Sequence, residues 1–429
     1  MKVISHKDSG YASFVRTLDR RAEPEAGVRE SVEAIIAEVR KRGDRALIDF
    51  TKKFDGVSLR TKDLFVTDEE FKEAARDVTP ATKRAIAASK KNIHAFAKAS
   101  LRKDWKQKNA QGVQVGERFV PFDRVGVYVP GGKAPLVSTA LMTGCFAQAA
   151  KVPEIVAATP AGPGGKVNSA LLYALQQAGA TEVLKVGGAH AVAALALGTN
   201  LVKRVDKIVG PGNSFVVEAK RQLVGAVSID LLPGPSEILI VADATGRPDF
   251  IAADLLAQAE HGGDSCAGFV TNSARLLKAV QTEIEKQLQS LSRADYIRES
   301  LAKAGFAVLV RSVAEAVRLC NDFAPEHLSL IVKDEAKWLK EVRTAGAIYL
   351  GNDSPVAVGD FLAGPSHTLP TGGAGKSFSG LRADQFQRRT SVVKMTKAAA
   401  ARSLPAVQEF ARVEGLDAHG ESVRIRTGE

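Results

Sequence analysis

The stretch VGVYVPGGKAPLVSTALMTGCFAQAAKVPEIVAATP, residues 125–160, decides the fold class. It contains a short apolar strand, a glycine-rich loop, a helix of small apolar residues and a second apolar strand. The pattern continues with strands expected at residues 182–186 and 206–210. Strands and helices that alternate at this period predict right-handed βαβ units and a parallel sheet.

The alternation resumes after Pro235. Further strands are expected at residues 237–243, 267–272, 306–312, 327–332 and 346–351, with helices between them. The segment SIDLLPGPSE, residues 228–237, carries two prolines and a glycine and is the expected crossover. The predicted fold class is therefore α/β, with two parallel-sheet units that abut near residues 230–237.

Two regions lie outside these units. Residues 1–120 are expected to be helical, because apolar residues recur at helical spacing in Glu30–Ile48 and again after the start signal at Pro80. Residues 381–429 lose the alternation and show one expected helix, residues 401–413, before an EGLDAHG turn. A tail of about 50 residues with so few apolar positions cannot bury a core of its own. We expect it to dock on the body of the chain or on a second subunit.

The composition excludes several classes of protein. Of the 429 residues, 45% are hydrophobic and 25% are charged, which argues against a disordered or collagen-like chain. The three cysteines, Cys145, Cys266 and Cys320, are too few and too dispersed for a disulfide framework. No apolar run approaches the ~18–20 residues that cross a bilayer, and the N-terminus lacks the apolar core of a signal peptide. We therefore expect a cytoplasmic protein without a membrane partner.

The net charge of +11 is compatible with an anionic partner. Nucleic acid is disfavoured, because the basic residues are interleaved with acids and aromatic residues make up only 6% of the chain. A basic surface also suits anionic small molecules, including a dinucleotide.

Three glycine-rich loops each follow an expected strand and open a helix. They are YVPGGKAPL (128–136), VGGAHAVAALALG (186–198) and VGPGN (209–213). Such loops let backbone N–H groups approach an anion at a helix N-terminus. None matches G-x-G-x-x-G with its downstream acid, and GPGGKV and GGAGKS both fail the P-loop pattern. Each loop alone fits a tight turn, but three at the carboxyl ends of neighbouring strands favour a ligand site.

Four side chains have the chemistry of metal ligands. Gln258 and His261 end the expected helix of residues 251–263, and positions three residues apart share a helix face. Asp360 lies in a Gly/Pro-rich loop, and His419 lies in the tail. Two nitrogens and two oxygens suit Zn²⁺, Mn²⁺ or Co²⁺, with open positions for substrate. For the first pair, a surface helix end is the alternative.

Proton transfer is expected at Glu326 and His327, in the segment FAPEHLSLIV. The pair offers a group that titrates near neutral pH beside a carboxylate whose pKa burial can raise. A satisfied pair at a strand edge is the alternative. His367 lies in the same loop as Asp360, and the tail has no packing reason to carry Glu414.

These segments together resemble the histidinol dehydrogenase family. The resemblance runs from about residue 25 to residue 420 and rests on seven segments in the family's order: VGVYVPGGKAPLVST, VGPGN, GPSEILIVAD, LLAQAEHG, APEHL, AVGDFLAGPSHTLPT and EGLDAH. It implies incomplete Rossmann-like domains and a homodimer whose C-terminal tails cross to the other subunit. It also implies a zinc-containing, NAD-dependent oxidoreductase that converts L-histidinol through L-histidinal to L-histidine with two NAD⁺, the last steps of histidine biosynthesis.

The resemblance also implies a role for individual residues. The zinc ligands are Gln258, His261, Asp360 and His419, the last from the other subunit, and the acid/base pair is Glu326 and His327. The substrate contacts are Ser236, Gln258, His261, His327, Asp360, Glu414 and His419. The NAD contacts are Tyr128, His190 and Asn213. His190 departs from the family, which usually has Gln there, so the pH dependence of NAD binding is open.

The expected division of the chain follows from both arguments. Residues 1–24 form an N-terminal helical arm, and residues 25–121 join 237–380 in the α/β domain that carries the metal and catalytic residues. Residues 122–236 form the Rossmann-like NAD-binding domain, and residues 381–429 form the dimerisation tail.

Two alternatives belong to different functional classes. A paralogous dehydrogenase would act on another small polar alcohol such as sulfopropanediol, but Glu414 and His419 count against it, because an acid beside the substrate suits an amino alcohol. If the chain were a basic binding module without catalysis, some of the metal ligands would be missing. All four are present in the sequence.

Overall fold

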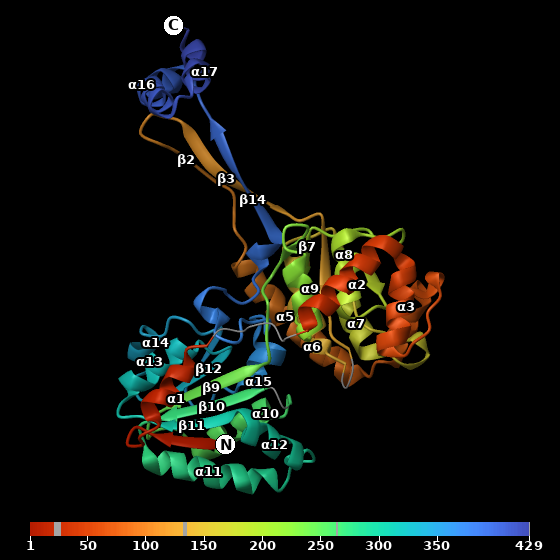
Figure 1. The fold of residues 1–429 in the computed structure, drawn as a ribbon, viewed down its shortest axis with the longest axis vertical. Coiled ribbons are helices and arrows are strands. Elements are labelled where there is room, and N and C mark those ends of the chain that lie inside the picture. Colours follow the sequence, from red (N-terminus) through yellow and green to blue (C-terminus); the bar gives the residue numbers. More distant parts are fainter. Residues whose placement is uncertain (21–26, 132–134, 263–264, 429) are drawn as a thin grey trace.

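The computed structural model describes residues 1–20, 27–131, 135–262 and 265–428. This part of the chain contains two parallel sheets and one antiparallel ribbon, which lie apart in Figure 1. None of its described helices is both long and apolar enough to cross a membrane. The boundary expected between residues 24 and 25, and residues 132–134 of the first glycine-rich loop, lie outside the described residues.

The first unit is a five-stranded parallel sheet in the order β6-β5-β4-β7-β8. Its strands are β4 (Arg124–Tyr128), β5 (Glu154–Ala158), β6 (Glu182–Leu184), β7 (Lys207–Val209) and β8 (Ser228–Ile229). Helices α6 (Val137–Ala149), α7 (Ser169–Gln177), α8 (Gly188–Leu197) and α9 (Ser214–Gln222) connect them. The predicted βαβ pattern is thus confirmed. Because the strand order turns back between β4 and β7, a ligand site is expected at the carboxyl ends of these strands.

The N-terminal helices pack on this same unit. They are α2 (Val28–Arg42), α3 (Asp44–Asp55), α4 (Asp68–Asp77) and α5 (Pro80–Ala99). α2 packs on α8 and α9, α4 on α7 and α5 on α6, whereas the expected division placed residues 25–121 with the second sheet. The reason is that α6 and α8 are apolar on nearly all sides, and such helices need a covering layer. The helix expected over Glu30–Ile48 breaks at Gly43, whose φ is +54°.

The second unit is a six-stranded parallel sheet in the order β1-β11-β10-β9-β12-β13. Its strands are β1 (Lys2–Ser5), β9 (Glu237–Ala242), β10 (Cys266–Thr271), β11 (Gly305–Leu309), β12 (His327–Ile331) and β13 (Ala347–Leu350). Its longer helices are α1 (Tyr11–Leu18), α10 (Pro248–Ala259), α11 (Ala274–Leu288), α12 (Ala294–Ala304) and α13 (Val313–Phe323). The five strands predicted here are confirmed. The N-terminal segment, expected as a helical arm, instead adds the edge strand β1. The strand was not predicted because its partner β11 lies some 300 residues away in the sequence.

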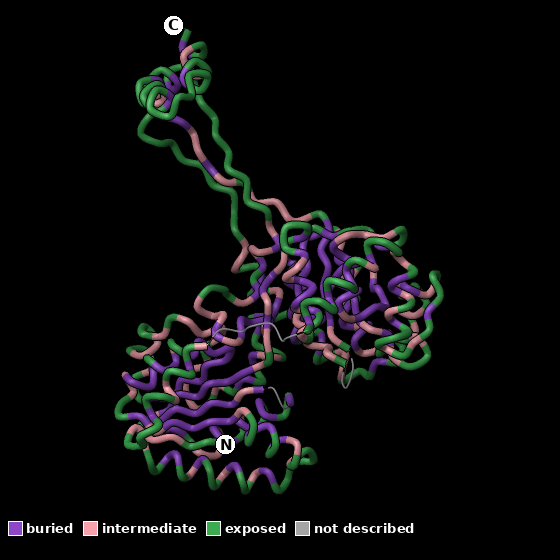
Figure 2. Tube along the Cα trace, viewed as in Figure 1, coloured by how far each residue is buried: buried purple, intermediate pink, exposed green. Residues whose placement is uncertain are grey.

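Short helical turns complete the two units. They are η1 (Thr61–Asp63), η2 (Pro163–Gly165), α14 (Glu335–Leu339), α15 (Val356–Val358), η3 (Gly359–Ala363), η4 (Ala374–Lys376) and η5 (Ala383–Phe386). The buried residues in Figure 2 gather in the two sheets and the helices against them.

A third part, which we call the arm, projects from the body (Figure 1). Its ribbon consists of β2 (Trp105–Lys108), β3 (Gln114–Pro121) and β14 (Gln387–Lys394), and it carries α16 (Lys397–Glu414) and α17 (Asp417–Thr427). The helix expected over 401–413 is confirmed within α16. The strands β2 and β3 replace predicted helix, and β14 and α17 were not predicted. Strand β14 pairs with β3 across more than 260 residues, whereas β2 and β3 are neighbours in the sequence.

Candidate active site and cofactor cavity

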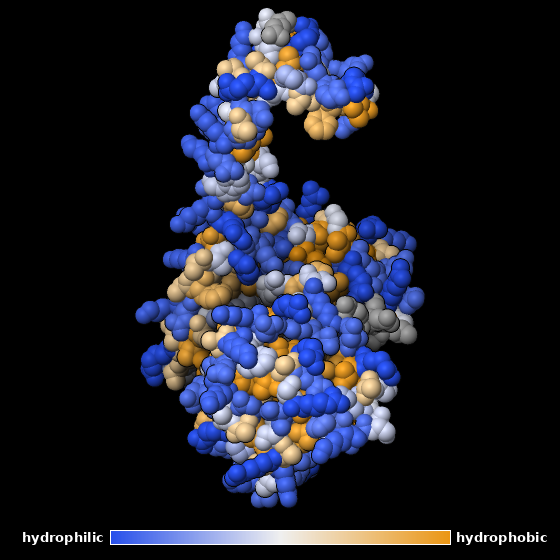
Figure 3. Space-filling view, turned by 90° about the vertical axis from the view of Figure 1, so that its left-hand side faces the viewer, coloured by the Kyte–Doolittle hydropathy of each residue, from blue (hydrophilic) through white to orange (hydrophobic). Residues whose placement is uncertain are grey.

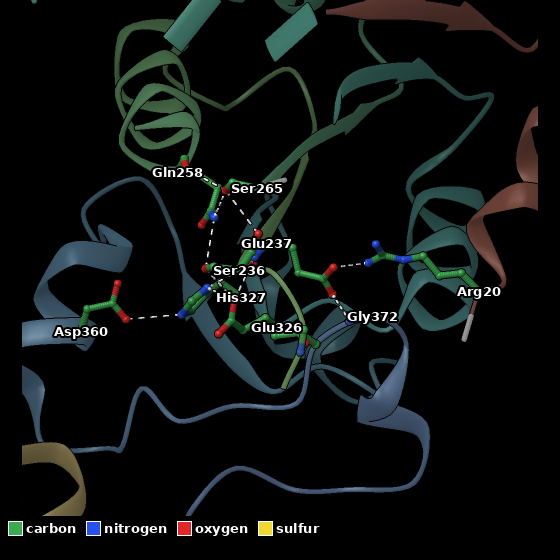
Figure 4. A network of polar contacts seen from close by, with 11 residues as sticks. Arg20, Ser236, Glu237, Gln258, Ser265, Glu326, His327, Asp360 and Gly372 are labelled. Atoms are coloured by element: carbon green, nitrogen blue, oxygen red, sulfur yellow. Dashed lines mark hydrogen bonds and ion pairs between the residues drawn. The ribbon is translucent and has the colours of Figure 1, made fainter. Parts of the chain in front are cut away.

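A polar cluster lies at the amino ends of two neighbouring strands. Glu237 is the first residue of β9 and His327 the first residue of β12, and these strands pair in parallel. Ser236 and Glu326 directly precede them. Helix α10 returns from the carboxyl end of β9 to this same edge, so Gln258 in its last turn joins the cluster. Side chains from three separate segments therefore meet here (Figure 4).

A continuous series of hydrogen bonds connects the residues of the cluster. The Gln258 Nε2 donates to Ser236 Oγ at 3.1 Å and to Ser265 Oγ at 2.6 Å. Ser236 Oγ donates to Glu326 Oε2 at 2.7 Å, and the Glu237 backbone N–H donates to the same oxygen at 2.8 Å. The Ser236 hydroxyl therefore links the Gln258 amide to the Glu326 carboxyl.

His327 lies between two carboxylates. Its Nδ1 donates to the Glu237 carbonyl oxygen at 3.1 Å and lies 3.5 Å from Glu326 Oε2, while its Nε2 lies 3.3 Å from Asp360 Oδ1. Burial alone would lower the pKa of His327, but the charges of Glu326 and Asp360 outweigh it and raise the pKa to about 9. The imidazole is therefore a stronger base than a free histidine.

The two carboxylates respond in opposite directions. Glu326 is 6% exposed, and burial raises its pKa against the opposing effect of His327. Asp360 lies on η3, and although its partial burial acts to raise its pKa, the contact with His327 lowers it overall. The cluster thus pairs one carboxyl whose pKa is raised with one whose pKa is lowered.

Two supporting residues were missed from the sequence. The buried Glu237 side chain forms an ion pair with Arg20, and its Oε1 accepts a hydrogen bond from Gly372 N–H at 3.2 Å. Burial raises the pKa of Glu237 to about 7. The guanidinium of Arg20 also lies 3.7 Å from the centre of the Phe323 ring. A charged residue at the start of a buried strand, directly after Ser236, was the available signal for Glu237.

The expected metal ligands are only partly assembled in one chain. Gln258 is in the cluster, and His261 follows the end of α10, with its backbone N–H donating to the Gln258 carbonyl at 3.2 Å. Desolvation lowers the pKa of His261, although the residue as a whole is exposed. Among the described residues, no three His, Cys, Asp or Glu side chains lie close enough to hold a metal ion.

The atoms present nevertheless fit a bound cation. Asp360 Oδ1 and His327 Nε2 are buried and lack a partner in hydrogen-bonding geometry, although they lie within ion-pair distance of each other. Both recorded hydrogen bonds of the Gln258 side chain use its nitrogen, which leaves the amide oxygen, the atom that binds cations, available. The donor types are those that zinc accepts.

The two predicted tail residues lie elsewhere. Glu414 ends α16 and His419 lies on α17, both on the arm and both exposed. Figure 1 shows the arm helices far from β9 and β12 of the same chain. The structure therefore brings Ser236, Gln258, Glu326, His327 and Asp360 together and keeps the two tail residues apart.

His367 and Cys266, which the sequence also singled out, lie outside the hydrogen-bonded cluster. His367 Nε2 lies 3.2 Å from Thr139 Oγ1 on α6, and desolvation lowers the pKa of His367. This contact joins the two units. Cys266, the first residue of β10, has its pKa raised to about 12 by burial, and its Sγ donates to the Ala304 carbonyl at 3.3 Å. A thiol in this state is no nucleophile at neutral pH.

A separate cavity of about 380 Å³, which we call the cofactor cavity because the expected NAD contacts line it, lies at the carboxyl edge of the five-stranded sheet. Tyr128, His190 and Asn213, the expected NAD contacts, all line it. The Tyr128 hydroxyl accepts the Gly188 N–H at 2.9 Å, and Asn213 Oδ1 accepts the Val216 N–H at 3.1 Å as the N-cap of α9. The three glycine-rich loops predicted from the sequence therefore converge on one hollow.

His190 is the most deeply buried of the three, at 1% exposure. Neither of its ring nitrogens has a hydrogen-bond partner, and the rings of Phe50 and Phe54 lie 5.6 and 5.9 Å away. Burial lowers the pKa of His190 to about 4, so the ring is neutral at physiological pH. A neutral imidazole keeps one donor and one acceptor, as an amide does.

A buried ion pair that the sequence did not reveal supports the third loop. Lys220 and Asp230 pair with both side chains fully buried. Lys220 Nζ donates to the Gly210 carbonyl at 3.0 Å, and Asp230 Oδ2 accepts the Gly210 N–H at 2.7 Å. Gly210 has φ +115°, and a Cβ there would lie 2.1 Å from the Tyr128 carbonyl oxygen. The pair thus holds the loop against the end of β4.

Comparison with known proteins gives a consistent result. A family model described as histidinol dehydrogenase matches residues 18–427. The histidinol dehydrogenase of Synechococcus sp. is 43% identical over 427 residues, covering 99% of this chain and 98% of that protein. The histidinol dehydrogenase of Xylella fastidiosa is 44% identical over 432 residues, covering 100% of this chain and 99% of that protein.

Solved structures agree with these relatives. The crystal structure of histidinol dehydrogenase from Elizabethkingia anophelis superimposes with a TM-score of 0.94 at 33% identity, covering 99% of this chain and 98% of that chain. An acetylating aldehyde dehydrogenase from Geobacillus thermoglucosidasius has a TM-score of 0.50 at 13% identity, covering 86% of this chain and 97% of that one, a likeness of fold alone.

Proposed function

The chain belongs to the histidinol dehydrogenase family, and on this premise we propose that it oxidises L-histidinol through L-histidinal to L-histidine with two NAD⁺. The observation that carries the proposal is the buried cluster in which Glu326 and Asp360 flank His327 and connect through Ser236 to Gln258. Such a cluster suits an alcohol whose oxidation requires repeated proton removal.

His327 takes the substrate proton in both oxidations. Because its pKa is about 9, the imidazole must first lose its own proton to act at neutral pH. In the first, the hydroxyl proton leaves to the imidazole as hydride leaves the carbon for NAD⁺, and the aldehyde results. The carboxylates of Glu326 and Asp360 stabilise the imidazolium that forms. The same stabilisation raises the pKa of His327. His327 releases this proton to solvent and then accepts the proton of the aldehyde hydrate in the second oxidation.

Glu326 activates the water that adds to the aldehyde. Burial raises the pKa of its carboxyl, which brings the group toward the range in which a general base works at neutral pH. Oxidation of the hydrate by a second NAD⁺ gives the acid. The sum consumes one water and two NAD⁺ and yields the carboxylic acid, two NADH and two protons.

Gln258, His261 and Asp360 would hold a Zn²⁺ ion, with His419 completing the set. When bound there, the metal orients the substrate and polarises its reacting oxygen. The buried, unpartnered Asp360 Oδ1 supports this role of Asp360. Ser236 and Glu414 then contact the substrate.

The arm supplies Glu414 and His419 to a second copy of the chain. Three observations support this homodimer: the arm projects away from its own cluster, it packs mainly on itself, and it exposes large apolar side chains. Phe410, Val413 and Ile425 are 68%, 67% and 59% exposed. Hydrophobic atoms also show on the body below the arm in Figure 3. On the body, the Phe361 side chain is 60% exposed. Both surfaces would be covered in a dimer with exchanged arms.

The experiment is NADH formation from L-histidinol, with and without a chelator and with metal analysis of the protein. We expect turnover that the chelator abolishes and that added Zn²⁺ restores. Sulfopropanediol serves as the comparison substrate. Turnover of that diol without turnover of L-histidinol would overturn the proposed substrate.

A further inference from the structure

The cofactor cavity contains two polar side chains that the fold leaves unsatisfied. Asp55 is the last residue of α3, and its Oδ2 is buried without a hydrogen-bond partner. Both nitrogens of His190, at 1% exposure, are likewise unpartnered. Buried polar atoms are satisfied in nearly all native proteins, and an unsatisfied one lowers stability. Both residues line the cavity, so their unpartnered atoms are candidates for hydrogen bonds to a ligand bound there.

The size and lining of the cavity indicate which part of a dinucleotide it takes. Its volume of about 380 Å³ is near the lower end of pockets that hold small ligands, so it suits one nucleoside half. Phe54 and Phe215 provide flat aromatic surfaces for a base, and Ile35 provides an apolar one. None of the lining residues belongs to the six-stranded unit that carries Glu326 and His327. The half bound here is therefore the one remote from hydride transfer, the adenosine.

The charges around the cavity distinguish the two common dinucleotides. Asp55 is an acid, and the described residues that line the cavity include no Lys or Arg. A carboxylate accepts a hydrogen bond from a ribose hydroxyl. A 2′-phosphate instead brings about two negative charges to a partly buried carboxylate, with no Lys or Arg among the described lining residues to compensate them.

We propose that Asp55 accepts the hydrogen bond of the adenosine 2′-hydroxyl and thereby selects NAD over NADP, an inference that rests on the NAD dependence proposed above. In the ordinary dinucleotide fold this acid follows the glycine motif by about 20 residues. Here α3 supplies it from a helix that precedes the sheet in the sequence. This explains why no acid follows the glycine-rich loops in the expected position.

The first experiment uses the unmodified protein and equilibrium competition against NADH fluorescence. The probes are 5′-AMP, 2′-deoxy-5′-AMP and adenosine 2′,5′-bisphosphate. We expect 5′-AMP to compete, the 2′-deoxy analogue to bind about tenfold more weakly, and the bisphosphate about 100-fold more weakly. Equal binding of the three nucleotides would overturn the role of Asp55, independently of any result with variants.

The second experiment measures the dissociation constants of NADH and NADPH for Asp55→Asn. The matched control is Asp49→Asn, an exposed carboxyl on the same helix that does not line the cavity. We expect the NADPH/NADH ratio of dissociation constants to fall at least tenfold in Asp55→Asn and to stay constant in the control.

An unchanged ratio in folded Asp55→Asn, checked by circular dichroism, would overturn the inference. A wild-type protein that binds neither NADH nor 5′-AMP would overturn the proposed NAD dependence as well. NADH binding without discrimination against NADPH would overturn the role of Asp55 alone.

Discussion

The cofactor cavity and the polar cluster lie at opposite edges of their sheets. The cavity lies at the carboxyl ends of β4, β5 and β7, where ligands of open α/β sheets are expected. The cluster lies at the amino ends of β9 and β12. The cavity is lined by helix residues and by the loops that follow the strands, whereas the cluster places polar side chains at strand starts and a helix end. The general rule for α/β sheets thus predicts one site and misses the other.

The same residue type behaves differently in the two places. His190 is surrounded by apolar and aromatic groups, and burial lowers its pKa to about 4. His327 is buried to a similar extent, but two carboxylates raise its pKa to about 9. Burial alone disfavours charge, while an adjacent opposite charge reverses that effect. The neighbours rather than the burial therefore decide in which direction the pKa of each histidine shifts.

The largest expected effect is on proton transfer in the cluster. His327→Ala should impair oxidation of both the alcohol and the aldehyde, by about 10²–10⁴-fold. Glu326→Gln should slow aldehyde oxidation much more than the first hydride transfer, because only the former needs an activated water. Single-turnover kinetics with L-histidinol and with L-histidinal separates the two steps, and Glu341→Gln on the surface is the control. Aldehyde oxidation within a few-fold of wild type in Glu326→Gln would move the water-activating role to His367.

The next effect concerns the metal at the same edge. His261→Asn should remove a ligand and reduce turnover by at least about 100-fold while the protein folds normally. Glu260→Gln, the adjacent exposed carboxyl, should keep both metal and activity. Metal analysis that finds full zinc occupancy in His261→Asn would contradict the assignment.

A third experiment asks whether the cluster is complete within one chain. His327→Ala and His419→Ala should each be inactive alone, because each lacks one part of every site. After subunit exchange, half of the dimers are mixed and one of their two sites is intact, so about a quarter of wild-type activity should return. If exchange is verified and no activity returns, the arm acts in its own subunit.

The smallest effect lies on the cavity side and concerns stability. The pKa of His190 is about 4 in the folded protein against 6.5 for the free side chain, so the unfolded chain binds more protons between these values. Stability from this group is complete above pH 6.5 and is lost as the pH falls toward 4. The loss amounts to about 2 kcal/mol of unfolding free energy between pH 8 and pH 5.

His190→Gln should remove this acid-dependent loss, whereas His6→Gln, a change at a partly exposed histidine, should keep it. Urea unfolding at both pH values measures the difference. The same pH dependence in wild type and His190→Gln would show that the ring is not buried neutral.

Local sequence patterns were sufficient for most of the framework. Strand β5 coincides with the predicted residues 154–158, and β9 and β12 begin at the predicted residues 237 and 327. Such strands are short apolar runs with glycine and proline at their ends, so their limits follow from the residues themselves. The ribbon was missed because β14 pairs with β3 across more than 260 residues, and its exposed residues carry no apolar alternation.

The residue types at Gln258, Glu326, His327 and Asp360 identified a candidate site from the sequence alone, because their chemistry is visible without coordinates. Only the tertiary structure decided that Ser236 joins Gln258 to Glu326, that Arg20 pairs with Glu237, and that Asp55 faces the cofactor cavity. Those relations depend on distance between segments that are remote in the chain. Distance, burial and the resulting pKa values arise when the chain packs, and local periodicity does not encode them.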